Sequence, residues 1–267
     1  MPVMETEEHV AALERQGKLL ADAADRAGPD AVVPTCPDWR VRDVIRHIGY
    51  VHRWATGYVA GQLTEMVPEL TEAEQFAAGT PDDELTDWYT SGLTGLITAL
   101  GQADPAMAAW TFLPAPSPRA FWARRQAHET AIHRADAEAA AAGWPNYPAE
   151  FAADGIDELL IGFYGRDAAR AAAAPAPHAD ARALEVRAVD TGQAWHVGLS
   201  QDASRILTTA RGDRQDRPAP DCTVSGPASG LYLLLWNRAD PATAGVVVSG
   251  EASLLDGWVS NMHVTWA

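Results

Sequence analysis

Two residues that can bind a metal lie one helical turn apart in the segment "RQAHETAIHRADAE", residues 125–138. Glu129 and His133 are four residues apart, and a helix places such residues on one face, within about 40° of each other. A carboxylate and an imidazole on one face can bind one divalent ion. If this face is buried, the two side chains need a partner, because burying them alone costs on the order of several kcal/mol.

The same spacing is also found on exposed helix faces, where Arg125, Glu129, His133 and Asp136 would form solvated ion pairs. His47 favours a metal site, because it lies within the apolar stripe of an earlier expected helix. A helix bundle brings such stripes face to face. The sequence therefore predicts a metal site formed by His47, Glu129 and His133.

Two histidines and one glutamate are typical of a catalytic zinc ion or another divalent ion, with at least one coordination position left for water or substrate. A fourth ligand from His52 or His128 would instead favour a structural site. His128 and His133 are five residues apart, so the segment does not have the H-E-x-x-H spacing of zinc metalloproteases.

Four segments with helical periodicity must position these residues. They cover residues 4–28, a stretch after Pro37 that contains His47, residues 81–101 and residues 118–142. The last segment begins with Ser117 placed to cap it and Pro118 at its first position. With no strand expected among them, these segments predict a four-helix bundle over residues 4–142.

The segment "GWPNYP", residues 143–148, interrupts this pattern, and the domain boundary is expected there. A helix follows near 150–172, and then alternating apolar residues around Thr191 and Gly192 predict a β-hairpin. Further strands are expected near 205–210, 222–225 and 245–249, between the apolar helices "GLYLLLWNR" and "SLLDGWVSNM". The predicted fold class is α+β, with a helical domain at 1–147 and a small α+β domain at 148–267.

Charge and composition limit the partners. The formal net charge of −16 argues against nucleic acid and anionic membranes as partners. The two cysteines lack disulfide spacing, and the N-terminus does not resemble a signal peptide. No apolar run is long enough to span a bilayer. We therefore expect a cytoplasmic protein with a small-molecule substrate. The sequence does not determine the oligomeric state.

Four blocks, in this order, carry a resemblance to a known family. They are "VPTCPDWRVRDVIRHIGYVHRW", "WARRQAHETAIHRADAE", "DTGQAWHV" and "SGPASGLYLLLWNR". The chain resembles the mycothiol-dependent maleylpyruvate isomerase family, whose members join a DinB-like metal-binding bundle to a C-terminal domain similar to sterol carrier folds. One difference is Arg40, where relatives tend to have a helix-capping Ser or Thr; Asp38 is expected to cap instead.

The resemblance implies that His47, Glu129 and His133 match the family's metal ligands, usually of zinc, and that Arg238 matches its catalytic arginine. It also implies a metal-activated mycothiol thiolate that adds to a conjugated double bond and leaves after rotation. The same thiolate would serve a mycothiol S-transferase for detoxification or biosynthesis. A third alternative is a non-catalytic protein that binds a small apolar ligand.

Overall fold

The structure, a computed structural model, describes residues 4–67, 74, 80–172, 181–212 and 219–264. The chain forms two compact units, Met1–Pro145 and Asn146–Ala267. The first is helical, and the second contains a five-stranded sheet with helices. This agrees with the α+β class expected from the sequence.

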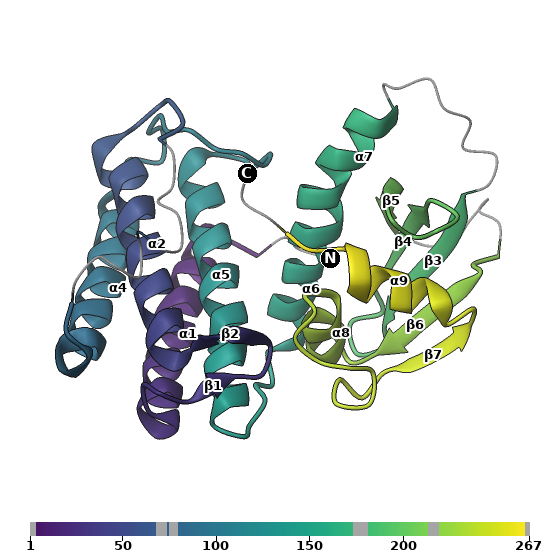
Figure 1. Ribbon diagram of the computed structural model, residues 1–267. Coiled ribbons are helices and arrows are strands. Elements are labelled where there is room, and N and C mark those ends of the chain that lie inside the picture. Colours follow the sequence, from purple (N-terminus) through teal and green to yellow (C-terminus); the bar gives the residue numbers. More distant parts are fainter. Residues whose placement is uncertain (1–3, 68–73, 75–79, 173–180, 213–218, 265–267) are drawn as a thin grey trace. The chain divides into compact units, whose positions relative to one another are not determined.

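The first unit contains four long helices that pack side by side (Figure 1). They are α1 (Thr6–Ala27), α2 (Val41–Gly61), α4 (Leu85–Gln102) and α5 (Pro118–Ala140). Helix α5 contacts α1 and α2, and α2 also contacts α4. Apolar residues at helical spacing, among them Leu13, Leu20, Ile48, Leu96 and Trp122, are buried between these helices. The predicted bundle is therefore present.

A short hairpin joins α1 to α2, where no strand was expected from the sequence. Strands β1 (Val32–Val33) and β2 (Cys36–Arg40) pair antiparallel, with an irregular register after Val32. This hairpin is hard to predict from the sequence, because Pro34 and Pro37 argue against strands there. In addition, β1 has only two residues, which are too few to show the alternation of apolar and polar residues that marks a strand. This hairpin lies close to the predicted metal ligands, as described below.

The start of α2 also differs from expectation. Asp38 lies within β2 and is exposed, so it is not the helix cap. The cap position is Arg40, whose backbone N–H donates to the Asp43 carboxylate at 2.8 Å. An acid at the third helical position thus satisfies a free backbone donor that a capping Ser or Thr would not reach.

The second unit begins with helical elements and continues into the sheet. Helix α6 (Ala149–Asp157) passes into a π-helical turn (Glu158–Phe163) and then α7 (Tyr164–Ala172), where one continuous helix was expected. The strands are β3 (Arg182–Ala188), β4 (Ala194–Leu199), β5 (Ile206–Arg211), β6 (Cys222–Gly226) and β7 (Val247–Gly250). Helices α8 (Ala228–Leu235) and α9 (Ser253–Asn261) complete the unit.

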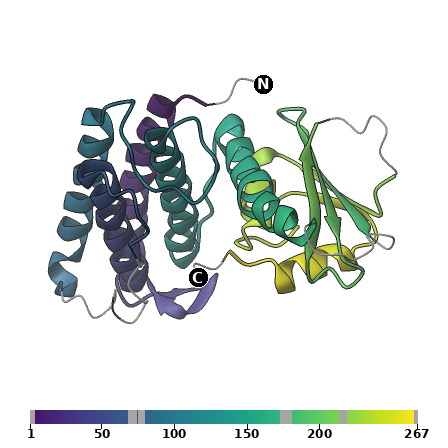
Figure 2. The ribbon, with the colours of Figure 1, turned by 90° about the horizontal axis from the view of Figure 1, so that it is seen from above.

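The sheet order is β5-β4-β3-β6-β7. Strands β3 and β4 form the predicted hairpin, with Val186 opposite Trp195, and β6 returns parallel to β3. Helix α7 lies along one face of the sheet and contacts β5, while α8 contacts β6 and β3 (Figure 2). Leu184, Val186 and Val197 are buried, which explains the alternating apolar pattern in the sequence.

Candidate metal centre

Helices α2 and α5 bring the three predicted ligands together. His47 comes from α2, and Glu129 and His133 come from α5. One ligand atom from each lies within 4.8 Å of the others. Their exposed fractions are 7%, 6% and 8%, so the alternative of a solvated, exposed face is wrong.

Two of the three separations within this cluster match those of a tetrahedral metal site. Oε1 of Glu129 lies 3.5 Å from Nε2 of His47 and 3.4 Å from Nε2 of His133. Both separations are longer than a good N–H···O hydrogen bond. Ligands held at ordinary zinc distances in a tetrahedron are about 3.4 Å apart. The residues present therefore fit a divalent ion held by two imidazoles and one carboxylate oxygen.

Arg125 engages the other oxygen of this carboxylate. Its Nη2 donates to Oε2 of Glu129 at 2.8 Å, and the arginine is 1% exposed. Burial alone would raise the pKa of Glu129, but the charge of Arg125 and the nearby imidazoles of His133 and His47 lower it well below its usual range. Glu129 is thus an anion whose Oε1 faces the two histidines.

His133 has a second carboxylate on its opposite edge. Its Nδ1 lies 2.8 Å from Oδ2 of Asp136, which is fully buried. Burial by itself would lower the pKa of His133, whereas the neighbouring carboxylates of Asp136 and Glu129 outweigh it and raise that pKa. The imidazole therefore lies between two acids of α5.

The hairpin places one aromatic side chain, Trp39, against the two histidines of the cluster. The ring of Trp39 in β2 is stacked on His133, with centroids 5.9 Å apart and planes 6° apart, and it meets the edge of His47 at 5.2 Å. The two histidine rings are 4.8 Å apart. Trp39 thus limits rotation of both imidazoles without offering a ligand atom.

The two histidines that could have completed a structural site are engaged elsewhere. Nε2 of His52 lies 2.9 Å from the Thr130 hydroxyl, and burial lowers the pKa of His52 to about 3. His128 is buried with its ring 6.1 Å from that of His9. The cluster of His47, Glu129 and His133 thus offers three candidate ligands, the number that catalytic zinc sites usually have.

Arg238 lies in the second unit, just after α8. Its Nη1 donates to the carbonyl oxygen of Trp236 at 2.8 Å, and its backbone N–H donates to Leu233. The guanidinium is thereby tied to the end of the helix. Its assignment as the catalytic arginine stays a prediction.

Sequence reasoning missed the contribution of the hairpin. Thr35 contacts Asp136, and Trp39 stacks on His133. Both belong to a proline-containing stretch that shows no strand periodicity in the sequence. Asp136 offered a better signal, because it shares the helix face of Glu129 and His133.

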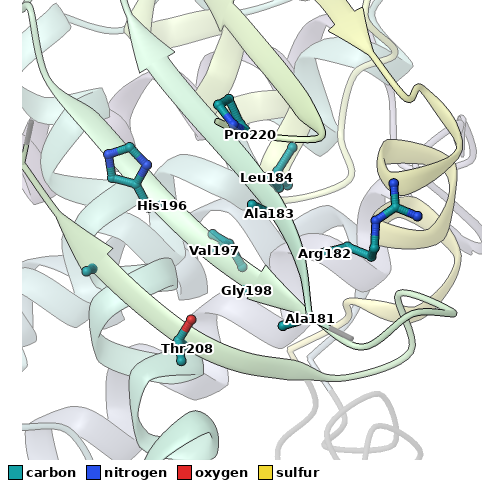
Figure 3. A pocket seen from close by; sticks show the side chains of 10 residues that line it. Ala181, Arg182, Ala183, Leu184, His196, Val197, Gly198, Thr208 and Pro220 are labelled. Atoms are coloured by element: carbon teal, nitrogen blue, oxygen red, sulfur yellow. The ribbon is translucent and has the colours of Figure 1, made fainter. Parts of the chain in front are cut away.

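A separate hollow of about 350 Å³ lies on the sheet of the second unit (Figure 3). Ala183, Gly198 and Ala210 leave space there, and His196 and Thr208 contribute polar groups. Arg182 is at the rim, where it pairs with Asp221 and Glu251. The described residues that line this hollow include one histidine and no carboxylate, so they do not form a second metal cluster.

Family models match both units of the chain. Residues 10–138 match the mycothiol maleylpyruvate isomerase N-terminal domain, and residues 150–257 match the C-terminal domain of the same family. The chain belongs to the mycothiol-dependent maleylpyruvate isomerase family. This membership supports an enzyme with a mycothiol-dependent, isomerase-type function.

Two crystal structures share the fold. One is of the mycothiol-dependent maleylpyruvate isomerase, with a TM-score of 0.62 and 15% identity. The other is of a histidine-to-alanine mutant of the mycothiol-dependent maleylpyruvate isomerase, with a TM-score of 0.63 and 14% identity. Each match covers 93% of this chain and 95% of the other. No curated protein sequence matches the chain. Within the described residues, none of the helices is both long and apolar enough to cross a bilayer.

Proposed function

We propose that this protein is a mycothiol-dependent isomerase whose divalent metal, zinc by its donor set, is held by His47, Glu129 and His133. The observation that carries the proposal is the spacing of the cluster. Two imidazole nitrogens lie 3.4 and 3.5 Å from one buried carboxylate oxygen, inside the domain that matches the family. Three protein ligands are typical of a catalytic zinc site.

A metal in this position would supply positive charge that lowers the pKa of a bound thiol, so that mycothiol is available as a thiolate at neutral pH. Glu129 contributes the negative charge among the three ligands. Arg125 holds Oε2 of Glu129 and thereby directs Oε1 toward the two histidines. Arg125 and the three proposed ligands are buried, so little water surrounds them and each electrostatic contact in the site is stronger.

Arg238 is proposed to bind the carboxylate of a small unsaturated acid and to stabilise negative charge that develops during the reaction. An arginine suits this role because its planar guanidinium can bind a carboxylate through two parallel hydrogen bonds. We place the enzyme in the cytoplasm, where its two cysteines, Cys36 and Cys222, stay as free thiols.

The test is mycothiol-dependent turnover of maleylpyruvate, run beside a panel of electrophiles. An isomerised product that requires both thiol and metal supports the proposal. A stable thioether product would identify an S-transferase instead. A protein that binds no thiol and turns over none of these compounds would contradict the proposal and favour a carrier of small ligands.

Two substitutions at Arg238 test its part separately. Arg238→Met removes the guanidinium and should raise KM and lower kcat, because substrate binding and charge stabilisation are both lost. Arg238→Lys is the matched control, because it keeps the charge and loses only the bidentate geometry. Equal activity in wild type and Arg238→Met would remove Arg238 from the mechanism.

A further inference from the structure

A chain of two short contacts connects the hairpin to one of the proposed metal ligands. The Thr35 hydroxyl, in the turn between β1 and β2, donates to Oδ1 of Asp136 at 2.5 Å. The other oxygen of Asp136 lies 2.8 Å from Nδ1 of His133. Asp136 is fully buried, so these partners take the place of water around its carboxylate.

This contact orients the His133 ring and favours one tautomer of its neutral form. An ionised carboxylate only accepts hydrogen bonds, so the nitrogen that faces Asp136 must be the N–H. In a neutral imidazole the lone pair is then on Nε2, the atom 3.4 Å from Oε1 of Glu129. A metal requires this lone pair, and it lies on the side of the ring where the other two ligands meet.

We propose that Asp136, held in place by Thr35, is a positioning residue that keeps His133 in the tautomer and orientation needed for metal binding. This inference rests on the proposed function, since it assumes that the cluster binds a metal. The hairpin acts on His133 from two directions, because Trp39 stacks on the imidazole face while Thr35 fixes the acid at its edge. The hairpin residues thus do not bind the metal themselves. Thr35 acts through Asp136, and Trp39 acts through its contact with the His133 ring.

The experiment measures Co²⁺ affinity by competition with a chelator and records the visible absorption spectrum of the bound ion, which reports ligand geometry. Asp136→Asn keeps the shape but removes the charge and one of the two acceptor oxygens, so it can no longer accept from both Thr35 and His133. We expect about 10- to 100-fold weaker binding with a shifted spectrum. Thr35→Val should weaken binding in the same direction. Thr35→Ser retains the hydroxyl and should bind Co²⁺ as the wild type does.

A control separates this effect from general destabilisation. Gln16→Met removes a buried acceptor, Oε1, which receives a hydrogen bond from Arg134 of α5 at 2.8 Å. It should lower the melting temperature of the metal-free protein and leave the Co²⁺ affinity and spectrum unchanged. Thr35→Val and Thr35→Ser provide the test even if Asp136→Asn fails to fold.

The outcomes distinguish this inference from the proposed function. If wild type binds Co²⁺ while Asp136→Asn and Thr35→Val match its affinity and spectrum, the positioning role is refuted and the metal site stands. If wild type does not bind Co²⁺, or if His47→Ala binds it as tightly as wild type, the proposed site fails and this inference fails with it.

Discussion

Replacing Glu129 by glutamine should destabilise the metal-free protein by about 3–5 kcal/mol, which is the usual cost of removing one partner of a buried ion pair. The glutamine keeps nearly the same shape but loses the charge. The guanidinium of Arg125 would then lose the charged acceptor at its Nη2.

The structure supports a cost of this size rather than that of a surface pair. Nη2 of Arg125 lies 2.8 Å from Oε2 of Glu129, and the two side chains are 1% and 8% exposed. Exposed pairs contribute about 0–1 kcal/mol, because water and salt screen them. Here little water is available to stabilise the charge that is left behind.

The assay is urea unfolding followed by tryptophan fluorescence, with a chelator present to remove metal. The informative control is the double variant Arg125→Met, Glu129→Gln. Replacing both members of a buried pair is often nearly neutral, so the double variant should regain most of the lost stability. It should still fail to bind metal, which separates folding from the function of the site.

Two results would refute this reasoning. One is a loss below about 1 kcal/mol for Glu129→Gln, which would put the pair in the range of exposed ion pairs. The other is a double variant that is no more stable than the single one, since the penalty would then not come from the lost charge pairing of Arg125 with Glu129.

Two further predictions concern stability. The pKa of His52 is lowered from 6.5 to about 3 by burial, so between these values the unfolded chain binds a proton that the folded chain does not. Unfolding free energy should therefore fall by about 1.4 kcal/mol per pH unit as pH drops below 6.5, and His52→Gln should flatten this slope in urea titrations. In α8, a Cβ on Gly230 would lie 1.9 Å from the carbonyl oxygen of Ala244, so Gly230→Ala should cost about 1–3 kcal/mol by thermal unfolding. Gly95→Ala, with open space around its Cβ, is the control and should be neutral or stabilising.

Much of the fold could be predicted because its periodic patterns are strong. The apolar stripes of the four long helices and the alternating residues of β3 and β4 follow directly from which faces are buried. The π-helical turn at Glu158–Phe163 was missed because its residues continue the apolar pattern of the flanking helices. The hairpin between α1 and α2 was missed because a strand of two residues shows no period at all.

The three residues of the cluster could be predicted because spacing on α5 and the apolar surroundings of His47 converge on one location. Their partners could not, since the contact between Thr35 and Asp136 joins residues 101 positions apart in sequence. Whether Glu129 and Asp136 were buried or solvated also depended on packing, and the two alternatives could not be separated from spacing on one helix.

The most direct test of the proposed metal site is the metal content of the purified protein. It is measured on the wild type and on three variants, His47→Ala, Glu129→Ala and His133→Ala. Elemental analysis after dialysis should find about one divalent ion per chain in the wild type and a large loss in each variant, because each removes one of three ligands. Retention of the full metal content in all three variants would contradict the account.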